Sequence, residues 1–167
     1  MDNRVVKADL ARWAEVYRLG KPYSTRDYAM LFLNFMTFLP EFRNLFYLRA
    51  GIKARLLSWL CPALATLEIV PTNIGPGLFI QHGNSTMISA ERIGANCWIN
   101  QHVVIGYSND TDRPTLGDNV RISAGAKIIG KIKIGNNATI GLNTVVIDNV
   151  PPNVTVFGVP GRIIWKG

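Results

Sequence analysis

Residues 116–146 are LGDNVRISAGAKIIGKIKIGNNATIGLNTVV, and an aliphatic residue returns in this stretch at every sixth position. The same spacing extends back to Ile74, with two interruptions before Leu116. A period of six matches neither the 3.6 residues of an α-helix nor the alternation of a β-strand. A repeat this short cannot bury its apolar side alone and must stack on copies of itself, which predicts a solenoid.

Six residues make one short strand and a corner, so three hexapeptides make one triangular turn. Such a turn of about 18 residues rises by roughly one strand spacing, ~4.8 Å. The anchor residues then form two columns, one of Ile74, Ile93, Leu116 and Ile134 and the next of Ile80, Ile99, Ile122 and Ile140. This pattern predicts a mainly β protein, a parallel β-helix of about four turns. The register breaks by one residue within 86–92 and by five between Ile105 and Leu116, where we expect a loop.

The N-terminal part lacks this period, so we divide the chain into a helical N-terminal cap, residues 1–65, and a β-helix domain, residues 66–167. Helices are expected over residues 5–19, 24–39, 41–50 and 53–60, each ending at a glycine or a proline. The second helix has no charge from Tyr28 to Leu39 but is too short to cross a bilayer, which needs ~20 residues.

Two interpretations of these apolar helices stay open. They can pack on each other, on the end of the β-helix or on another subunit. Alternatively, apolar residues such as Phe32, Phe35, Phe38, Leu56 and Trp59 can attach the protein to a membrane surface, with lysine and arginine residues nearby.

Charge and cysteine content exclude several classes of function. The net charge is +7, and residues 1–60 carry most of the basic excess, ten Lys/Arg against five Asp/Glu. No stripe of alternating basic and aromatic residues follows the repeats, so we expect no nucleic-acid partner. Cys61 and Cys97 stand in unrelated contexts without the spacing of a disulfide framework or a metal site, and Cys97 falls at an inward position. The chain opens without a signal-peptide pattern, so a cytoplasmic location is expected.

The chain has two histidines, His82 and His102, in the second column of hexapeptides of successive coils, with outward side chains on one face. A catalytic zinc site on such a helix would need three nitrogen or sulfur ligands, and two histidines 20 residues apart fall short, so no metal is expected. A single neutral imidazole suffices as a general base. A carboxylate on its other ring nitrogen would orient it, and Glu68, Glu91 and Asp112 are candidates between which spacing does not choose.

Three motifs occur in order: GLFIQHG at 77–83, ISAGAKI at 122–128 and GVPGR at 158–162. Together they resemble the serine acetyltransferase family of left-handed β-helix acyltransferases, over roughly residues 66–166. The resemblance implies acetyl transfer from acetyl-CoA to a hydroxyl group, without a metal. It also implies a left-handed helix and a homotrimer, or a dimer of trimers, with sites between adjacent β-helices.

The resemblance also assigns residues. It makes His82 the catalytic base and places Glu68, in Glu68-Ile69-Val70-Pro71, where the family has the aspartate that partners this histidine. The CoA groove is expected at Gly106, Ala124, Gly125, Leu142 and Arg162.

Two departures from the family concern the acceptor. Gln81 replaces an aspartate associated with binding the amino-acid substrate, and Asp112-Arg113-Pro114 lacks the histidine of the family's loop. Gln81, His102 and Arg113 are the expected substrate-binding residues. We expect L-serine or a similar small acceptor; the alternatives are a saccharide hydroxyl in surface-polysaccharide assembly and a non-catalytic β-helix scaffold.

Overall fold

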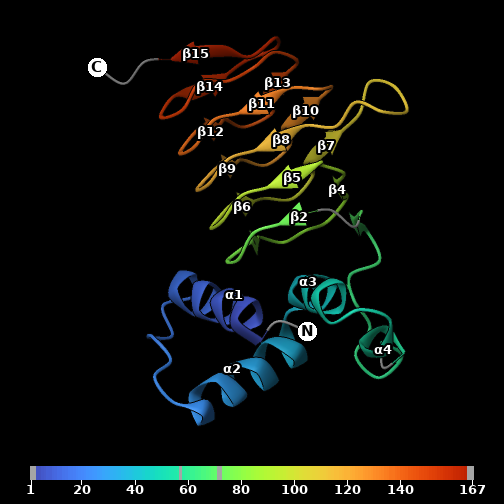
Figure 1. Cartoon of the computed structure of the whole chain (residues 1–167), viewed down its shortest axis with the longest axis vertical. Coiled ribbons are helices and arrows are strands. Elements are labelled where there is room, and N and C mark those ends of the chain that lie inside the picture. The colour runs from blue at the N-terminus through green and yellow to red at the C-terminus, as the bar shows by residue number, and fades with distance from the viewer. Residues whose placement is uncertain (1–2, 57, 71–72, 165–167) are drawn as a thin grey trace.

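A parallel β-helix forms the C-terminal part of the chain, and four α-helices form a cap at the end where its first coil lies (Figure 1). The structure is a computed structural model that describes residues 3–56, 58–70 and 73–164. The predicted fold class, mainly β with a parallel β-helix and a small helical cap, is confirmed. The β-helix has about five turns, one more than the sequence predicted, because a coil begins before Ile74.

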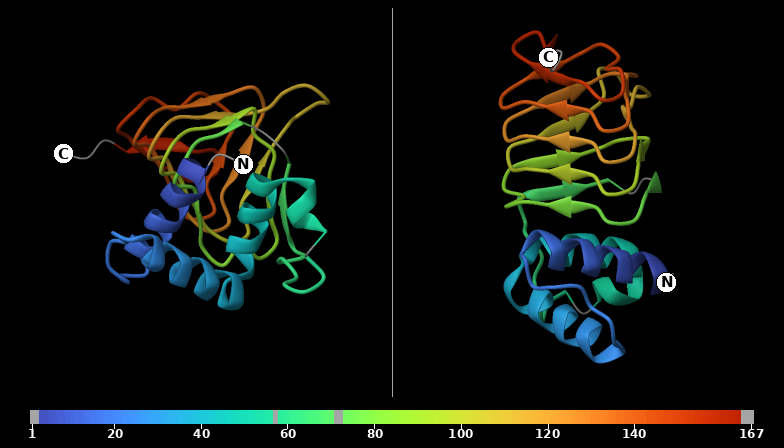
Figure 2. Two further views of the ribbon diagram at one scale, coloured as in Figure 1. Left: turned by 60° about the horizontal axis from the view of Figure 1, so that its bottom comes forward. Right: turned by 90° about the vertical axis from the view of Figure 1, so that its left-hand side faces the viewer.

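Three sheets make the faces of the β-helix, and each strand pairs with the strand one coil away (Figure 2). Face A contains β1 (Leu67–Ile69), β4 (Thr86–Ile88), β7 (Val104–Gly106), β10 (Lys127–Ile129) and β13 (Val145–Val146). Face B contains β2 (Asn73–Ile74), β5 (Arg92–Ile93), β8 (Thr115–Leu116) and β11 (Lys133–Ile134). Face C contains β3 (Phe79–Ile80), β6 (Trp98–Ile99), β9 (Arg121–Ile122), β12 (Thr139–Ile140), β14 (Thr155–Phe157) and the antiparallel return strand β15 (Arg162–Ile164).

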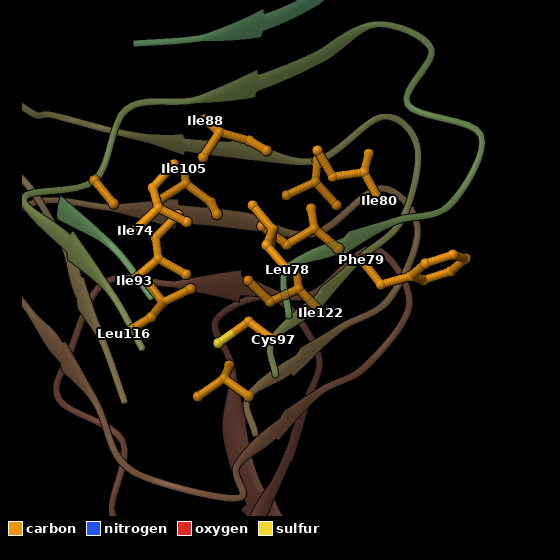
Figure 3. Packing of buried hydrophobic residues seen from close by; sticks show 14 of the residues in the cluster. Ile74, Leu78, Phe79, Ile80, Ile88, Ile93, Cys97, Ile105, Leu116 and Ile122 are labelled. Atoms are coloured by element: carbon orange, nitrogen blue, oxygen red, sulfur yellow. The ribbon is translucent and has the colours of Figure 1, made fainter. Parts of the chain in front are cut away.

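Both predicted columns are present. Ile93 pairs with Ile74 and Leu116 on face B, and Ile99 pairs with Ile80 and Ile122 on face C. Figure 3 shows the labelled members of both columns, Ile74, Ile93, Leu116, Ile80 and Ile122, pointing into one interior. Face A adds a third column that the sequence analysis did not identify, made of Ile69, Ile88, Ile105, Ile128 and Val146.

Cys97 lies in this interior, at the inward position expected for it. Its Sγ is 3.2 Å from the carbonyl oxygen of Gly117. Burial raises the pKa of the thiol to about 11, so the side chain stays protonated and serves as a small apolar residue.

The one-residue register break assigned to residues 86–92 is wrong in its position. Ile88 follows Ile80 by eight residues and precedes Ile93 by five, instead of six each. The corner before β4 therefore gains two residues and the corner after it loses one. The longer corner contains His82 and Gly83, whose φ angles are 64° and 52°.

Asparagine makes the corners between faces B and C. Asn96, Asn119, Asn137 and Asn153 have φ angles from 55° to 61°, in the left-handed region that asparagine tolerates better than most residues. Each stands three residues before an inward residue of face C. The amides of Asn119, Asn137 and Asn153 also form a hydrogen-bonded ladder up this edge. The corner residues thus support both the bend and the stacking.

The cap contains α1 (Asn3–Val16), α2 (Thr25–Phe38), α3 (Pro40–Ala50) and α4 (Ile52–Arg55). Ser24 and Asp27 form a capping box at the start of α2, as its expected beginning implied. The helix expected over 53–60 is much shorter, because the chain turns back where the carbonyls of Cys61 and Pro62 accept hydrogen bonds from Tyr47 and Arg43 of α3. In the described part of the chain, no helix is long and apolar enough to cross a membrane.

Aromatic side chains join the cap to the first coil. The Trp13 ring is fully buried, and its centroid lies 4.8 Å from that of Phe79 in β3 and 5.2 Å from that of Phe42 in α3. Edge-to-face pairs of this kind add to the burial of apolar area. The apolar core is therefore continuous from the cap into the β-helix. The domain boundary expected between residues 65 and 66 stays a prediction.

A buried ion pair makes the polar contact between the cap and the same coil. Arg49 Nε lies 3.1 Å from Asp9 Oδ2, and the two Nη atoms of Arg49 donate to the carbonyls of Ile74 and Gly75. Asp9 Oδ1 accepts a 2.7 Å hydrogen bond from the Gly77 N–H. Burial raises the pKa of the Asp9 carboxyl, and the Arg49 guanidinium opposes that shift. The pair thus satisfies backbone groups that have no coil below them.

Arg49→Ala should lower the free energy of unfolding by about 3–5 kcal/mol, because it leaves the Asp9 carboxylate buried and unpaired. Urea unfolding followed by circular dichroism measures the loss. Glu15→Gln is the control, since it removes a solvent-exposed ion pair to Arg12 and should cost less than about 1 kcal/mol. Equal losses in the two variants would contradict the role given to Arg49.

Candidate active site

His82 and His102 lie at successive corners where face C turns into face A. We name this edge, residues 81–85, 100–103, 123–126 and 141–144, the C/A edge. Backbone hydrogen bonds stack its corners: the His102 N–H donates to the Asn84 carbonyl at 2.8 Å, and the Gly125 N–H donates to the Gln101 carbonyl at 3.1 Å. Both histidine side chains are exposed, so the edge presents two imidazoles to solvent one coil apart.

The His82 corner is held against the cap. Its neighbour Gly83 is buried, and a Cβ added there would lie 2.9 Å from Cγ of Glu41 and within 3.2 Å of Leu64 and Leu67. No side chain fits at Gly83 without displacing these cap and first-strand residues. The cap therefore fixes the backbone from which the His82 imidazole extends.

Topology separates the three candidate carboxylates. Glu68 is exposed in β1 on face A and pairs with Met87 of β4, the strand that leaves the His82 corner. Glu91 and Asp112 lie on a different edge, between faces A and B. Glu68 is thus the carboxylate placed on the strands next to the C/A edge.

The hydrogen bonds of these carboxylates favour Glu68 over Asp112, but in the described part of the chain none of them joins Glu68 to His82. Asp112 Oδ2 already accepts hydrogen bonds from Ser108 Oγ and Asn109 Nδ2 in its own loop. Within the described ranges, no hydrogen bond or ion pair joins Glu68 to His82. Pro71, which ends the motif of Glu68, lies outside the described residues. Among the described residues, no three His, Cys, Asp or Glu side chains gather into a possible metal site.

A cavity of about 580 Å³ opens beside Glu68, between the cap and β1. Asn44, Tyr47 and Ser58 contribute polar groups to its wall, and Ile52 contributes apolar surface. A solute of modest size can therefore reach the Glu68 carboxylate from the side of the cap.

Most of the expected CoA-binding residues follow the same edge. Ala124 and Gly125 form the corner above His102, and Leu142, which is 63% exposed, lies on the corner above them. Arg162 pairs with Phe157 where the last coil reaches the edge. Gly106 does not join them, because it is buried at the far end of β7.

Arg113 also lies away from the C/A edge. It is half-buried in the loop of residues 107–114, which projects from the β-helix between faces A and B. This is the loop that the five-residue register break predicted. Hydrogen bonds from the backbone N–H groups of Thr111 and Asp112 to Asn109 Oδ1 close this loop on itself. Within one chain, then, Arg113 and His102 stand on different edges.

Gln81, next to His82, has a partner that the sequence analysis missed. Trp98 Nε1 donates a 3.2 Å hydrogen bond to Gln81 Oε1, and the Arg121 guanidinium stacks 4.2 Å from the Trp98 ring centroid. An indole N–H is a donor only, so it takes the amide oxygen and leaves the Gln81 NH₂ group for other partners. The sequence positions could have indicated this contact. Trp98 and Arg121 each precede an inward isoleucine, in successive coils, so their side chains point outward next to each other.

Lys127 is a second residue that sequence reasoning did not identify. Its Nζ donates to the carbonyls of His102 and Gly125 at 2.7 and 2.9 Å. This ammonium group therefore ties two consecutive corners of the C/A edge and adds positive charge beside them.

Sequence comparisons match this chain to known acyltransferases. Residues 113–148 match the family model described as bacterial transferase hexapeptide (six repeats). The serine acetyltransferase of Synechococcus elongatus is 41% identical over 127 residues, which cover 73% of this chain and 52% of that protein. The chain thus spans little more than half the length of the curated relatives it matches.

Solved structures give the same family. The serine acetyltransferase of Neisseria gonorrhoeae, in complex with serine, superposes with a TM-score of 0.70 at 31% identity and covers 97% of this chain and 68% of its own. A serine acetyltransferase in complex with CoA has a TM-score of 0.64 at 26% identity, covering 97% of this chain and 71% of its own.

Proposed function

Because this chain belongs to the serine acetyltransferase family, we propose that it transfers acetyl groups from acetyl-CoA to a hydroxyl group along the C/A edge. The observation that carries this proposal is the placement of His82, which begins a line of corners formed by His102, Ala124, Gly125 and Leu142. This line of corners provides a general base at one end, and the small residues Ala124 and Gly125 above it leave room for CoA.

The proposed reaction is direct and needs no acyl-enzyme. His82 removes the proton from the acceptor hydroxyl, and the oxygen attacks the thioester carbonyl carbon of acetyl-CoA. Backbone N–H groups of a neighbouring coil stabilise the oxyanion. The C–S bond then breaks, and the His82 imidazolium returns its proton to the CoA thiolate. The products are the acetyl ester and free CoA.

Glu68 has the role of a positioning carboxylate in this proposal. Its strand adjoins the strand that follows His82, its side chain is exposed, and Glu91 and Asp112 occupy another edge. A carboxylate on the second ring nitrogen would select the tautomer that accepts the proton and would stabilise the imidazolium.

CoA is proposed to run from His82 past Ala124, Gly125 and Leu142 towards Arg162. A serine acetyltransferase of the same fold is known in complex with CoA, which supports this substrate class. Gly106 and Arg113 could reach such a groove only from a neighbouring chain. Their positions therefore fit a homotrimer, or a dimer of trimers, with active sites between adjacent β-helices. The proposed location of this enzyme is the cytoplasm.

The acceptor proposed first is L-serine or a similarly small hydroxyl compound, since the gonococcal relative binds serine. One observation favours a saccharide hydroxyl as a second candidate. The ammonium group of serine favours a negatively charged acceptor, whereas Gln81 is neutral, accepts a hydrogen bond from Trp98 on its oxygen and offers two N–H donors. Sugar oxygens can accept those bonds.

His82→Ala should lower kcat by about 10²–10⁴-fold, the usual contribution of one general base. CoA thiol release from acetyl-CoA, measured with a working acceptor, gives the rate. A His82→Ala variant with a near wild-type kcat would refute the assignment.

Two carboxylate variants serve as the matched pair in the same assay. Glu68→Gln should lower kcat and change the pH profile of kcat/KM, because it removes the group that stabilises the imidazolium. Glu91→Gln, on another edge, should leave both unchanged. A response to Glu91→Gln alone would reassign the partner of His82.

Gln81→Glu tests the acceptor. Glutamate keeps the length that reaches Trp98 Nε1 and adds a negative oxygen, so it should raise activity with L-serine relative to a saccharide by about tenfold or more. A panel of L-serine, free sugars and nucleotide sugars measures the ratio for both proteins. An unchanged ratio would remove Gln81 from acceptor selection. The absence of CoA release with every acceptor, together with the absence of acetyl-CoA binding, would favour a β-helix scaffold.

A further inference from the structure

The exposed surface of the cap carries large apolar side chains. We name as the outer apolar face the residues Met30, Leu33, Phe38, Ile52, Leu56, Trp59 and Leu60, which are each between 60% and 77% exposed. Figure 2 shows α2 on the far side of α1 and α3 from the β-helix. Single exposed apolar residues are ordinary, but a contiguous group marks an interaction surface.

The two parts of this face are joined by Arg43. Its Nε donates to the Met36 carbonyl near the end of α2, and its Nη1 donates to the Pro62 carbonyl at 2.7 Å. Tyr47 also donates to the Cys61 carbonyl. The segment that follows Trp59 and Leu60 is thereby held next to the end of α2, where Phe38 lies.

Charge distinguishes the occupants that could cover this face. From residue 28 to residue 67 the only acidic residue is Glu41, and the basic residues Arg43, Lys53 and Arg55 are in the same span. Arg49 is not counted with them, because it is buried in its ion pair with Asp9. Glu41 packs on Gly83, on the side of the β-helix. At the start of α2 the exposed Arg26 stands beside Asp27, whose carboxylate caps that helix, so this pair adds no net charge. A second copy would bring equal positive charges together, whereas an anionic surface would complement them.

We propose that the outer apolar face docks the protein on an anionic lipid bilayer. Exposed tryptophan, leucine and phenylalanine side chains enter the boundary between headgroups and acyl chains, and basic residues meet the headgroups. Attachment is peripheral, since in the described residues no helix could span a bilayer. Ile52 and Ser58 also line the cavity beside Glu68, so docking would bring that cavity close to the lipid surface.

Cosedimentation of the full-length protein with phosphatidylcholine vesicles, with and without phosphatidylglycerol, tests this proposal. We expect binding to the anionic vesicles and its loss at high salt. Leu33→Gln combined with Trp59→Gln should weaken vesicle binding by about tenfold or more. Both residues are exposed, so circular dichroism should show an unchanged fold.

The control is Ile147→Gln combined with Ile164→Gln, which changes two exposed apolar residues of the β-helix and should leave vesicle binding unchanged. Equal binding by both double variants, or no binding of the wild type to anionic vesicles, would overturn the proposal. So would a fall in oligomer mass of the Leu33 and Trp59 variant, because a second copy would then cover this face. Acetyl transfer to a soluble acceptor without vesicles should be the same in all three proteins, so this test is independent of the proposed function.

Discussion

The first coil of a parallel β-helix exposes backbone N–H and C=O groups that no further coil can satisfy. In this protein Arg49 and Asp9 bind the Ile74 and Gly75 carbonyls and the Gly77 N–H, and the Trp13 indole donates to the Leu78 carbonyl. Every later strand is only two or three residues long and depends on the strand beneath it. The contact between cap and coil therefore supports the whole stack, including the corner that carries His82.

The sequence predicted the parts of the fold that depend on local spacing. Aliphatic residues at intervals of six identified the columns of faces B and C, and Gly51 marked the end of α3. The third column was not named, although Ile105, Ile128 and Val146 keep the period of six, because the intervals around Ile88 are eight and five. The docking of the cap could not be predicted, since Asp9 and Arg49 are forty residues apart and no spacing rule links them.

In the candidate site too, local spacing predicted some features and missed the contacts between coils. The hexapeptide register was enough to place His82 and His102 on successive coils and on the same side of the β-helix, and the structure puts both at the corner between faces C and A. The register could not show that Trp98 takes the Gln81 oxygen, because that contact depends on how two outward side chains from neighbouring coils turn towards each other. The register also could not choose between Glu68, Glu91 and Asp112 as partner of His82. The structure separates them, because Glu91 and Asp112 lie on the edge between faces A and B. In the proposed mechanism, the corner would fix the base, and side chains of neighbouring coils would set the environment of the acceptor.

In the proposed mechanism the C/A edge binds CoA with its sulfur next to His82. A crystal structure of the protein with CoA tests this most directly. We predict CoA along the corners of Ala124, Gly125 and Leu142, with its sulfur near the His82 imidazole. CoA bound along another edge of the β-helix, with its sulfur away from His82, would contradict this account.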